Sequence, residues 1–370
     1  MEIELLVRPK SILMSLLTAR GWSQEITFAT NNKQRKQDNR DALRAAIAQA
    51  LTTQGLRTGV RVEEYKNWTV TDEPSLDEVP GFWRIELVSR AMTTAENWQR
   101  EVADIFEAMY KYCDITLTKG CSMHVHVSPS LVATNQTMYT MDDVRKVLKA
   151  VAYFDDPMTR MMPADRKANE WAKSNIHSDT TPSNVKQTYL KVRQNTWKPL
   201  FRIYDNIKNK HHLLLEFSKD KFLSWNFRHL VDECGTIEFR RPPGVRTAAA
   251  ANHWVSFTLG FASEALRVDW RSVEDTTGYP SVENLATFVK SGIVRLEQTS
   301  RDAILDALLV EDISPSTVYS AAELEIIKRK KAEKAKAPSP FAEKANSRPN
   351  TPASRTSSPG AQSTSSRGKK

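Results

Sequence analysis

Glycine, cysteine and long apolar runs are all scarce in this sequence, and each shortage excludes a class of protein. Only 12 of the 370 residues are Gly, and neither GxGxxG nor GxxxxGK[ST] occurs, so two familiar phosphate-binding loops are absent. The three cysteines form no CxxC pair, which favours reduced thiols in a cytoplasmic protein over disulfides or a zinc–thiolate site. No apolar run approaches the roughly 18 residues of a membrane helix, and early acids replace the basic region of a secretory signal.

An excess of positive charge is also missing from most of the chain, although the net charge is +9. Of the 53 Lys and Arg residues, 12 lie after Ile327 with only two of the 44 acids, which leaves 41 basic and 42 acidic residues before that point. The first part therefore gives no charge argument for nucleic-acid binding. Residues 328–370 contain few large apolar side chains, so we predict a disordered basic tail after a catalytic domain of residues 1–327.

The tail begins with Lys328-Arg329-Lys330-Lys331, which has two interpretations. It is either a nuclear localisation signal, which would add a nuclear location to the cytoplasmic one, or the basic end of a helix. Three Ser-Pro or Thr-Pro pairs follow and are candidate phosphorylation sites. The sequence indicates no partner for the tail.

Apolar spacing divides residues 1–327 into helices and short strands without an internal repeat. Helices are expected at residues 38–53, 93–112, 141–154, 247–268, 281–289 and 300–309. Strands are expected at residues 1–8, 58–65, 68–72, 83–89, 122–128, 213–217 and 236–240. Long helices interrupt these strands irregularly, which indicates an α+β domain.

Four of these strands separate polar from apolar side chains. Successive side chains of a strand alternate between its faces, so Glu2 and Glu4 lie opposite Ile3 and Leu5. The same alternation groups Arg84 with Glu86, Ser122 and Ser128 with His124 and His126, and Glu238 with Arg240. A sheet with one face in water would show a similar pattern, but such faces usually carry Thr, Lys and Ser.

A divalent cation would explain the charge of this face if helices enclose it. Glu2, Glu4, Glu86 and Glu238 would then be only half neutralised by Arg84 and Arg240. An unpaired buried ion costs several kcal/mol. Mostly carboxylate ligands with one histidine suit Mg²⁺ or Mn²⁺ better than Zn²⁺.

Four segments resemble, in order, the motifs of the amidoligase family, which belongs to the carboxylate–amine ligase superfamily with glutamine synthetase and glutamate–cysteine ligase. They are EIELL at 2–6, GFWRIELVS at 81–89, CSMHVHV at 121–127 and GTIEFR at 235–240. Supporting stretches are residues 68–76, Met162-Pro163 with Arg166 and Asn169, and Asn226 before the last strand. The resemblance covers residues 1–309.

The resemblance implies an antiparallel sheet curved into a glutamine-synthetase-like half-barrel, with helices on its outer side. ATP and two or three Mg²⁺ or Mn²⁺ ions would lie in the concave face. The metal ligands would be Glu2, Glu4, Glu86, His124 and Glu238. His126 and Ser128 would contact ATP, and Arg240, with Glu238, would act on the transferring phosphoryl group.

Further polar residues are candidates for the same site. Asp72, Arg166, Asn169 and Asn226 could bind substrate, although Asp72 could equally form a turn, and Arg166 and Asn169 could be surface or capping residues of a loop. Arg241 and Arg246 flank Pro242-Pro243-Gly244 and could reach substrate or ATP phosphates. His211 and His212 are expected in an exposed loop.

The chain departs from the family pattern at three places. It starts one residue before Glu2, so we expect either a first strand that is frayed at its start or a truncated gene model, and a frayed Glu2 would bind metal less tightly. Ser122 replaces a frequent Gly, and Arg90 replaces an expected Pro. Neither of these two changes removes a ligand.

These features predict an ATP-dependent ligase that forms an amide or isopeptide bond. ATP would activate a carboxylate as an acyl phosphate, which an amine then attacks; bridging metals and a guanidinium suit such phosphoryl transfer. The acid and amine could belong to small molecules, peptides or proteins, and the general base is not identified. The alternatives are a metal-dependent hydrolase using His124 and His126, which Arg240 disfavours, and an inactive binding protein, which the complete ligand set disfavours.

Overall fold

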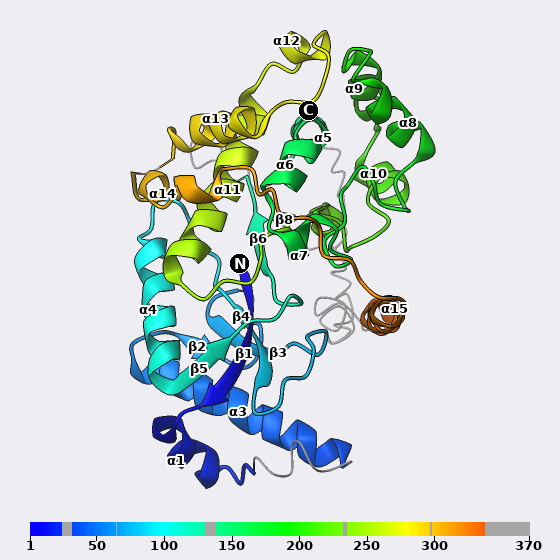
Figure 1. Ribbon diagram of the computed structural model, residues 1–370. Helices are drawn as coiled ribbons and strands as arrows, with labels where there is room; N and C mark the ends of the chain where they lie inside the picture. The colour runs from blue at the N-terminus through cyan, green and yellow to red at the C-terminus, as the bar shows by residue number, and fades with distance from the viewer. Residues whose placement is uncertain (24–31, 64, 130–137, 232–234, 297, 337–370) are drawn as a thin grey trace, which may run out of the picture. The chain divides into compact units, whose positions relative to one another are not determined.

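The computed structural model describes the chain except for residues 24–31, 64, 130–137, 232–234, 297 and 337–370 (Figure 1). Contacts divide the chain into two units, Met1–Ile327 and Lys328–Lys370. Helix α15, Ala321–Lys336, continues through the basic residues 328–331. Those residues are therefore the basic part of a helix, which corrects the predicted start of disorder; the rest of the predicted tail lies outside the described residues.

One sheet holds all the described strands of the first unit. The strand order is β2-β3-β4-β1-β6-β8-β7, and β5 pairs with the far half of β1. Their bounds are β1 Glu2–Pro9, β2 Thr58–Gly59, β3 Trp68–Asp72, β4 Trp83–Val88, β5 Cys113–Thr116, β6 Met123–Val127, β7 Trp225–Asn226 and β8 Ile237–Phe239. Within the described chain, β2 and β3 pair in parallel and the other strand pairs are antiparallel.

Helices cover the apolar face of this sheet. Ile3, Leu87, Val125 and Phe239 point into one core, which also contains the buried residues of α3 (Lys33–Thr53), α4 (Trp98–Tyr112) and α11 (Ala248–Arg267). Figure 1 shows α4 and α11 side by side on the same side of the strands. The chain is thus a mixed α/β protein with a mostly antiparallel open sheet, as expected, whereas the glutamine-synthetase-like half-barrel stays a prediction.

The other helices connect and flank these elements. They are α1 Ser11–Ala19, α5 Met141–Tyr153, α6 Asp155–Met161, α7 Ala164–Lys167, α8 Ser183–Lys191, α9 Lys198–Asp205, α10 Lys210–Glu216, η2 Arg228–Leu230, α12 Arg271–Glu274, α13 Val282–Ile293, α14 Gln298–Asp302 and η3 Asp306–Leu308. The labels η2 and η3 denote short 3₁₀ helices. None of the described helices combines the length and the apolar character needed to cross a membrane.

Three predicted elements differ from the structure. Residues 213–217, predicted as a strand, belong mostly to helix α10, where the side chain of Asn209 caps the first turn by accepting the His212 N–H over 2.8 Å. His211 and His212 are therefore helical, although His211 is exposed. The strand expected at 58–65 is only Thr58–Gly59. Tyr65 has a positive φ of 52°, which is incompatible with an extended strand at that residue. The helix expected at 300–309 is divided into α14 and η3.

Strand β1 is held on both sides from its first residue. Glu2 pairs with Val88 of β4 and with His124 of β6. The Met1 ammonium donates to the Ser89 hydroxyl over 2.8 Å, and the Ser89 N–H donates to the Met1 carbonyl over 2.9 Å. The expectation of a frayed Glu2 is therefore wrong, because β1 is an interior strand.

Candidate functional site

The predicted polar side chains come from four strands that are neighbours in the sheet, β4, β1, β6 and β8. Their registers place Glu2 beside His124, Glu4 beside Glu86, and His126 beside Glu238. Residues directly opposite each other on antiparallel strands point to the same face. The sheet therefore brings these carboxylates and imidazoles together, and the cluster that they form is called the polar face below.

Glu2 links strand β1 to both histidines of β6. Its Oε2 lies 2.9 Å from Nδ1 of His124, and its Oε1 lies 3.3 Å from Nε2 of His126. Burial alone would raise the pKa of Glu2, but the imidazoles of His126 and His124 outweigh burial and hold that pKa well below its usual range. Glu2 is therefore ionised at neutral pH, as a metal-binding carboxylate must be.

Glu238 forms the charged centre of the polar face and is 1% exposed. Asn226 donates from Nδ2 to its Oε2 over 2.7 Å, and the Arg240 guanidinium donates to its Oε1. Burial opposes ionisation, but Arg240 and His126 lower the pKa of Glu238 well below its usual range. The pKa of Arg240 is raised in turn, because Glu238, Glu2 and Glu4 outweigh its own burial.

A second group of carboxylates surrounds Glu4. Oε2 of Glu4 accepts hydrogen bonds from the backbone N–H and the hydroxyl of Ser122, over 2.8 and 2.7 Å. Glu73 and Glu86 each offer a carboxylate oxygen, and with one from Glu4 these atoms lie within 4.8 Å of one another. The Thr71 hydroxyl donates to Oε2 of Glu86 over 3.2 Å. Strand β3 therefore extends the polar face beyond β4.

Glu73 lies with Glu4 and Glu86 on the polar face, although the sequence analysis names its neighbour Asp72 and not Glu73. Glu73 follows Thr71 by two positions, so the alternation of β3 continued by one residue places it on the face of Thr71. Asp72 projects to the other side, where its Oδ2 lies 3.4 Å from Nη1 of Arg40 on helix α3. The carboxylate of Asp72 thus faces a helix of the apolar side, and substrate binding by Asp72 stays a prediction.

His229 is the second residue that the sequence analysis missed. It lies on the short helix η2, just after β7, and its Nε2 is 3.4 Å from Oε2 of Glu238. Its ring centroid lies 5.1 Å from that of His126. No periodic signal marks it, because η2 is a single 3₁₀ turn outside any strand.

Three groups of described residues could each hold a metal ion: Glu2 with Glu86 and His124, Glu4 with Glu73 and Glu86, and His126 with His229 and Glu238. In each group the candidate ligand atoms lie within 4.8 Å of one another. The first two groups are mostly carboxylates, which suit Mg²⁺ or Mn²⁺. Arg240 offsets only part of their charge, so the donor set fits the cations that the sequence predicts.

Arg166 and Asn169 are buried beside the polar face, and Arg166 lies in helix α7 rather than in a loop. Arg166 donates to the carbonyl oxygens of Arg240 and Arg241 over 2.8 and 3.0 Å, while its Nη1 has no hydrogen-bond partner among the described residues. Burial lowers the pKa of Arg166 to about 10, with Glu4 as the largest opposing influence. Arg166 therefore holds the backbone of the two residues that follow β8, Arg240 and Arg241. Substrate binding by Arg166 and Asn169 stays a prediction.

Arg246 lies just before helix α11, and its contact with ATP stays a prediction. Its side chain is exposed at the start of α11, and its carbonyl accepts the hydroxyl of Tyr110 over 2.7 Å. Tyr110 belongs to α4, a helix of the apolar side. The buried guanidinium of Arg241 forms hydrogen bonds within the protein. It donates to Thr159 Oγ1 over 2.8 Å and to the Lys167 carbonyl over 3.0 Å.

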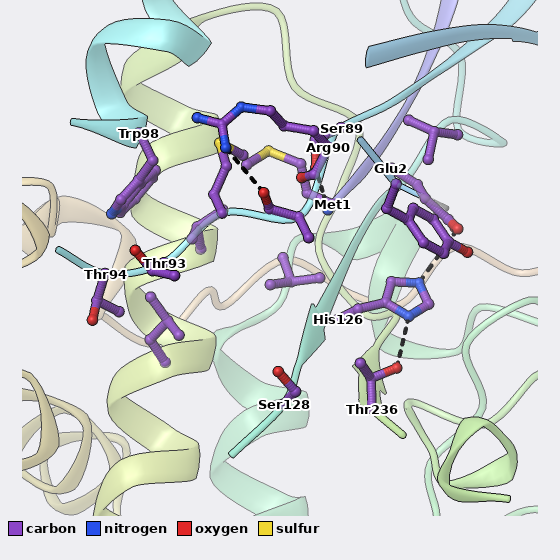
Figure 2. A pocket seen from close by; sticks show the side chains of 17 residues that line it. Met1, Glu2, Ser89, Arg90, Thr93, Thr94, Trp98, His126, Ser128 and Thr236 are labelled. Carbon is purple, nitrogen blue, oxygen red and sulfur yellow. Dashed lines mark hydrogen bonds and ion pairs between the residues drawn. The ribbon is translucent and has the colours of Figure 1, made fainter. Parts of the chain in front are cut away.

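A pocket of about 230 Å³ opens beside the polar face at the start of β1. Figure 2 shows Glu2, His126 and Thr236 on one side of it, and Thr93, Thr94 and Trp98 on the other. Val125, Val255 and Leu259 add apolar surface, and Ser128 lies at its edge. The pocket thus joins an apolar wall to the histidine end of the charged cluster.

Comparison with known proteins identifies a family for this chain. A family model described as "putative amidoligase enzyme" matches residues 18–262, which is more than half of the chain. The matched range includes Glu73, Glu86, both histidines of β6, Glu238 and Arg240, and it begins after Glu2 and Glu4. No curated protein and no solved structure matches the chain.

Proposed function

The chain belongs to the putative amidoligase enzyme family, a membership that indicates ligase activity, and from this premise we propose that it is an ATP-dependent carboxylate–amine ligase. In the proposed reaction the terminal phosphoryl group of ATP passes to a substrate carboxylate and gives an acyl phosphate and ADP. An amine then attacks the acyl carbon, phosphate leaves, and an amide or isopeptide bond forms. The excess amine proton is released to a base that is not identified.

One observation carries this proposal: a partly buried arginine lies beside the ionised carboxylate of Glu238 on the polar face. Arg240 is held against Glu238 at the centre of that face, and its pKa is raised. A fixed guanidinium stabilises the charge that develops during phosphoryl transfer, since it needs no reorganisation. A hydrolytic site that only activates water has less need of such a group.

Two of the ligand groups support the expected cations. Glu2, Glu86 and His124 would hold one Mg²⁺ or Mn²⁺ ion, and Glu4, Glu73 and Glu86 a second. Such ions, when bound, supply positive charge that neutralises phosphate oxygens. Ser122 and Thr71 fix Glu4 and Glu86 through hydrogen bonds, so the chain orients these carboxylates before any ion binds.

The pocket beside Glu2 and His126 is the proposed position of the ATP base and ribose. Its apolar wall of Val125, Val255 and Leu259 suits a flat heterocycle, and its polar end leads to the carboxylate cluster. His126 and Ser128 line this pocket, so they are the side chains proposed to contact ATP. Asn226 would act on catalysis through Glu238, to which it donates, rather than by touching the substrate.

The test is ADP release by the purified full-length protein with Mg²⁺, ATP and panels of carboxylates and amines. Glu238→Gln keeps the size of the side chain but removes the charge that pairs with Arg240, so we expect turnover to fall by at least about 100-fold. Glu107→Gln, on the exposed side of α4, is the matched control and should keep wild-type turnover. Equal ADP release by wild type and Glu238→Gln would sink the proposal.

One observation favours the alternative function, a metal-dependent hydrolase: the imidazole of His229 lies next to that of His126. Catalytic zinc sites often contain two histidines. The same panels separate the two functions. A hydrolase would cleave a substrate without nucleotide, whereas the proposed ligase leaves the carboxylate and the amine unchanged until ATP is added.

A further inference from the structure

His126, His229 and Glu238 form a compact group that the ligase proposal does not use as a metal site. His126 lies on β6, Glu238 lies opposite it on β8, and η2 places His229 above the same carboxylate. Nε2 of His126 is 3.8 Å from Oε1 of Glu238, and Nε2 of His229 is 3.4 Å from Oε2. Three separate elements thus direct one potential ligand atom each to a common point.

The ring of His126 is fixed at one nitrogen and directs the other toward carboxylates of the polar face. Nδ1 of His126 lies 3.3 Å from the hydroxyl of Thr236, which fixes the ring through its other nitrogen. Nε2 is buried and lies 3.3 Å from Oε1 of Glu2 and 3.8 Å from Oε1 of Glu238, but neither contact has hydrogen-bond geometry. A metal-binding imidazole is usually fixed by a hydrogen bond at the nitrogen that does not bind the metal, and Thr236 could supply that bond at Nδ1 of His126.

The donor types decide which class of ion fits. Two imidazoles with one carboxylate suit borderline first-row transition metals, and the same combination occurs in catalytic zinc sites. Mg²⁺ prefers an all-oxygen, octahedral environment. We therefore propose that His126, His229 and Glu238 form a separate binding site for a transition-metal dication, with Zn²⁺ as the best-fitting ion, while the carboxylate groups bind Mg²⁺ or Mn²⁺. Metal binding is measured without nucleotide or substrate, so this site can be tested independently of ligase activity.

The experiment is a Zn²⁺ titration of the metal-free, full-length protein in excess Mg²⁺, followed by competition with a chromophoric chelator. Wild type should bind Zn²⁺ at least about 10-fold more tightly than His229→Ala. His211→Ala, an exposed histidine of α10, is the control and should match wild type. His124→Ala should also keep this Zn²⁺, because His124 belongs to the neighbouring group. Unchanged affinity in His229→Ala would overturn the proposal, as would loss of the ion in His124→Ala alone.

Two further measurements guard against a variant that does not fold. His229→Cys restores a zinc ligand, so it should recover affinity relative to His229→Ala. X-ray absorption of wild type loaded with one Zn²⁺ in excess Mg²⁺ should show two imidazole ligands. One imidazole, or none, would overturn the proposal whatever the variants show.

Discussion

Glu73 and Asp72 are neighbours in the chain, yet their carboxylates have opposite environments. Glu73 is 4% exposed and lies with Glu4 and Glu86, whereas Asp72 faces Arg40 on the helical side. The difference follows from the two-residue repeat of an extended chain. A substitution at each position therefore tests the polar face with a control one residue away.

We expect Glu73→Gln to weaken Mn²⁺ binding by more than about 10-fold, because it removes one charged ligand from the group around Glu4. Asp72→Asn should leave Mn²⁺ binding unchanged. Titration followed by electron paramagnetic resonance measures free Mn²⁺ directly in both variants. Equal affinities of the two variants would contradict the assignment of Glu73 to the polar face.

At this scale, the sequence predicted the residues that regular strands carry. Alternation fixes the face of every residue within a strand, so it predicted that one face carries Glu2, Glu4, Glu86, His124 and Glu238, whose roles as metal ligands stay predictions. Glu73 was missed because it follows the last paired residue of β3, and His229 because a 3₁₀ turn has no such rule. The contact of Arg166 with two carbonyls depends on tertiary packing, which no local pattern contains.

Among the elements, helix α11 has two roles. It packs on the sheet beneath the polar face, and it anchors the segment before η3, because Nδ1 of His253 accepts the N–H of Leu305 over 3.0 Å. His253 is completely buried, and burial lowers its pKa to about 4, against an opposing influence of Asp306. The folded protein therefore holds this imidazole neutral.

The stability of the fold should consequently fall on mild acidification. The unfolded chain takes up a proton at the ordinary histidine pKa of about 6.5, whereas folded His253 does so only near 4. Its contribution is present above about pH 6.5 and is lost as the pH falls towards 4, with a loss of about 2 kcal/mol between pH 7 and 5.

Urea unfolding at pH 7 and pH 5 measures this loss. His253→Gln cannot titrate, so its free energy of unfolding should decrease by about 2 kcal/mol less than that of wild type over the same interval. The comparison cancels the carboxylates that both proteins share. An identical decrease in both proteins would mean that His253 titrates normally in the folded state.

Element prediction succeeded where the hydrophobic repeat was long and failed where it was short. Helices α3, α4, α5 and α11 were all predicted, because each presents several turns of apolar residues to the core. Residues 213–217 contain Leu-Leu-Leu-Glu-Phe, a run too short to distinguish a strand from a buried helical turn. The side chain of Asn209 caps the helix and favours it over a strand. Asn209 lies outside residues 213–217, so the apolar run alone does not reveal this cap.

For the molecule as a whole, folding gathers carboxylates that the unfolded chain keeps apart. Glu2, Glu4, Glu73, Glu86 and Glu238 converge on one face, where Arg240 pairs with Glu238. Their mutual repulsion opposes folding, and helices on the apolar face offset it by burying Ile3, Leu87 and Phe239. The fold therefore places its main electrostatic cost where a cation can relieve it.

Cations that bind this face should consequently stabilise the folded chain. An ion that binds only the folded state at 100 times its Kd adds about 2.7 kcal/mol, which corresponds to a rise in Tm of roughly 4 °C for a folded unit of this size. Thermal unfolding with EDTA, with saturating Mn²⁺, and with NaCl of equal ionic strength separates binding from screening. Glu4→Gln should show a higher Tm than wild type in EDTA and a smaller rise with Mn²⁺, because the repulsion and the ligand disappear together. The same Tm for wild type in EDTA and in Mn²⁺ would show that the carboxylates bind no ion.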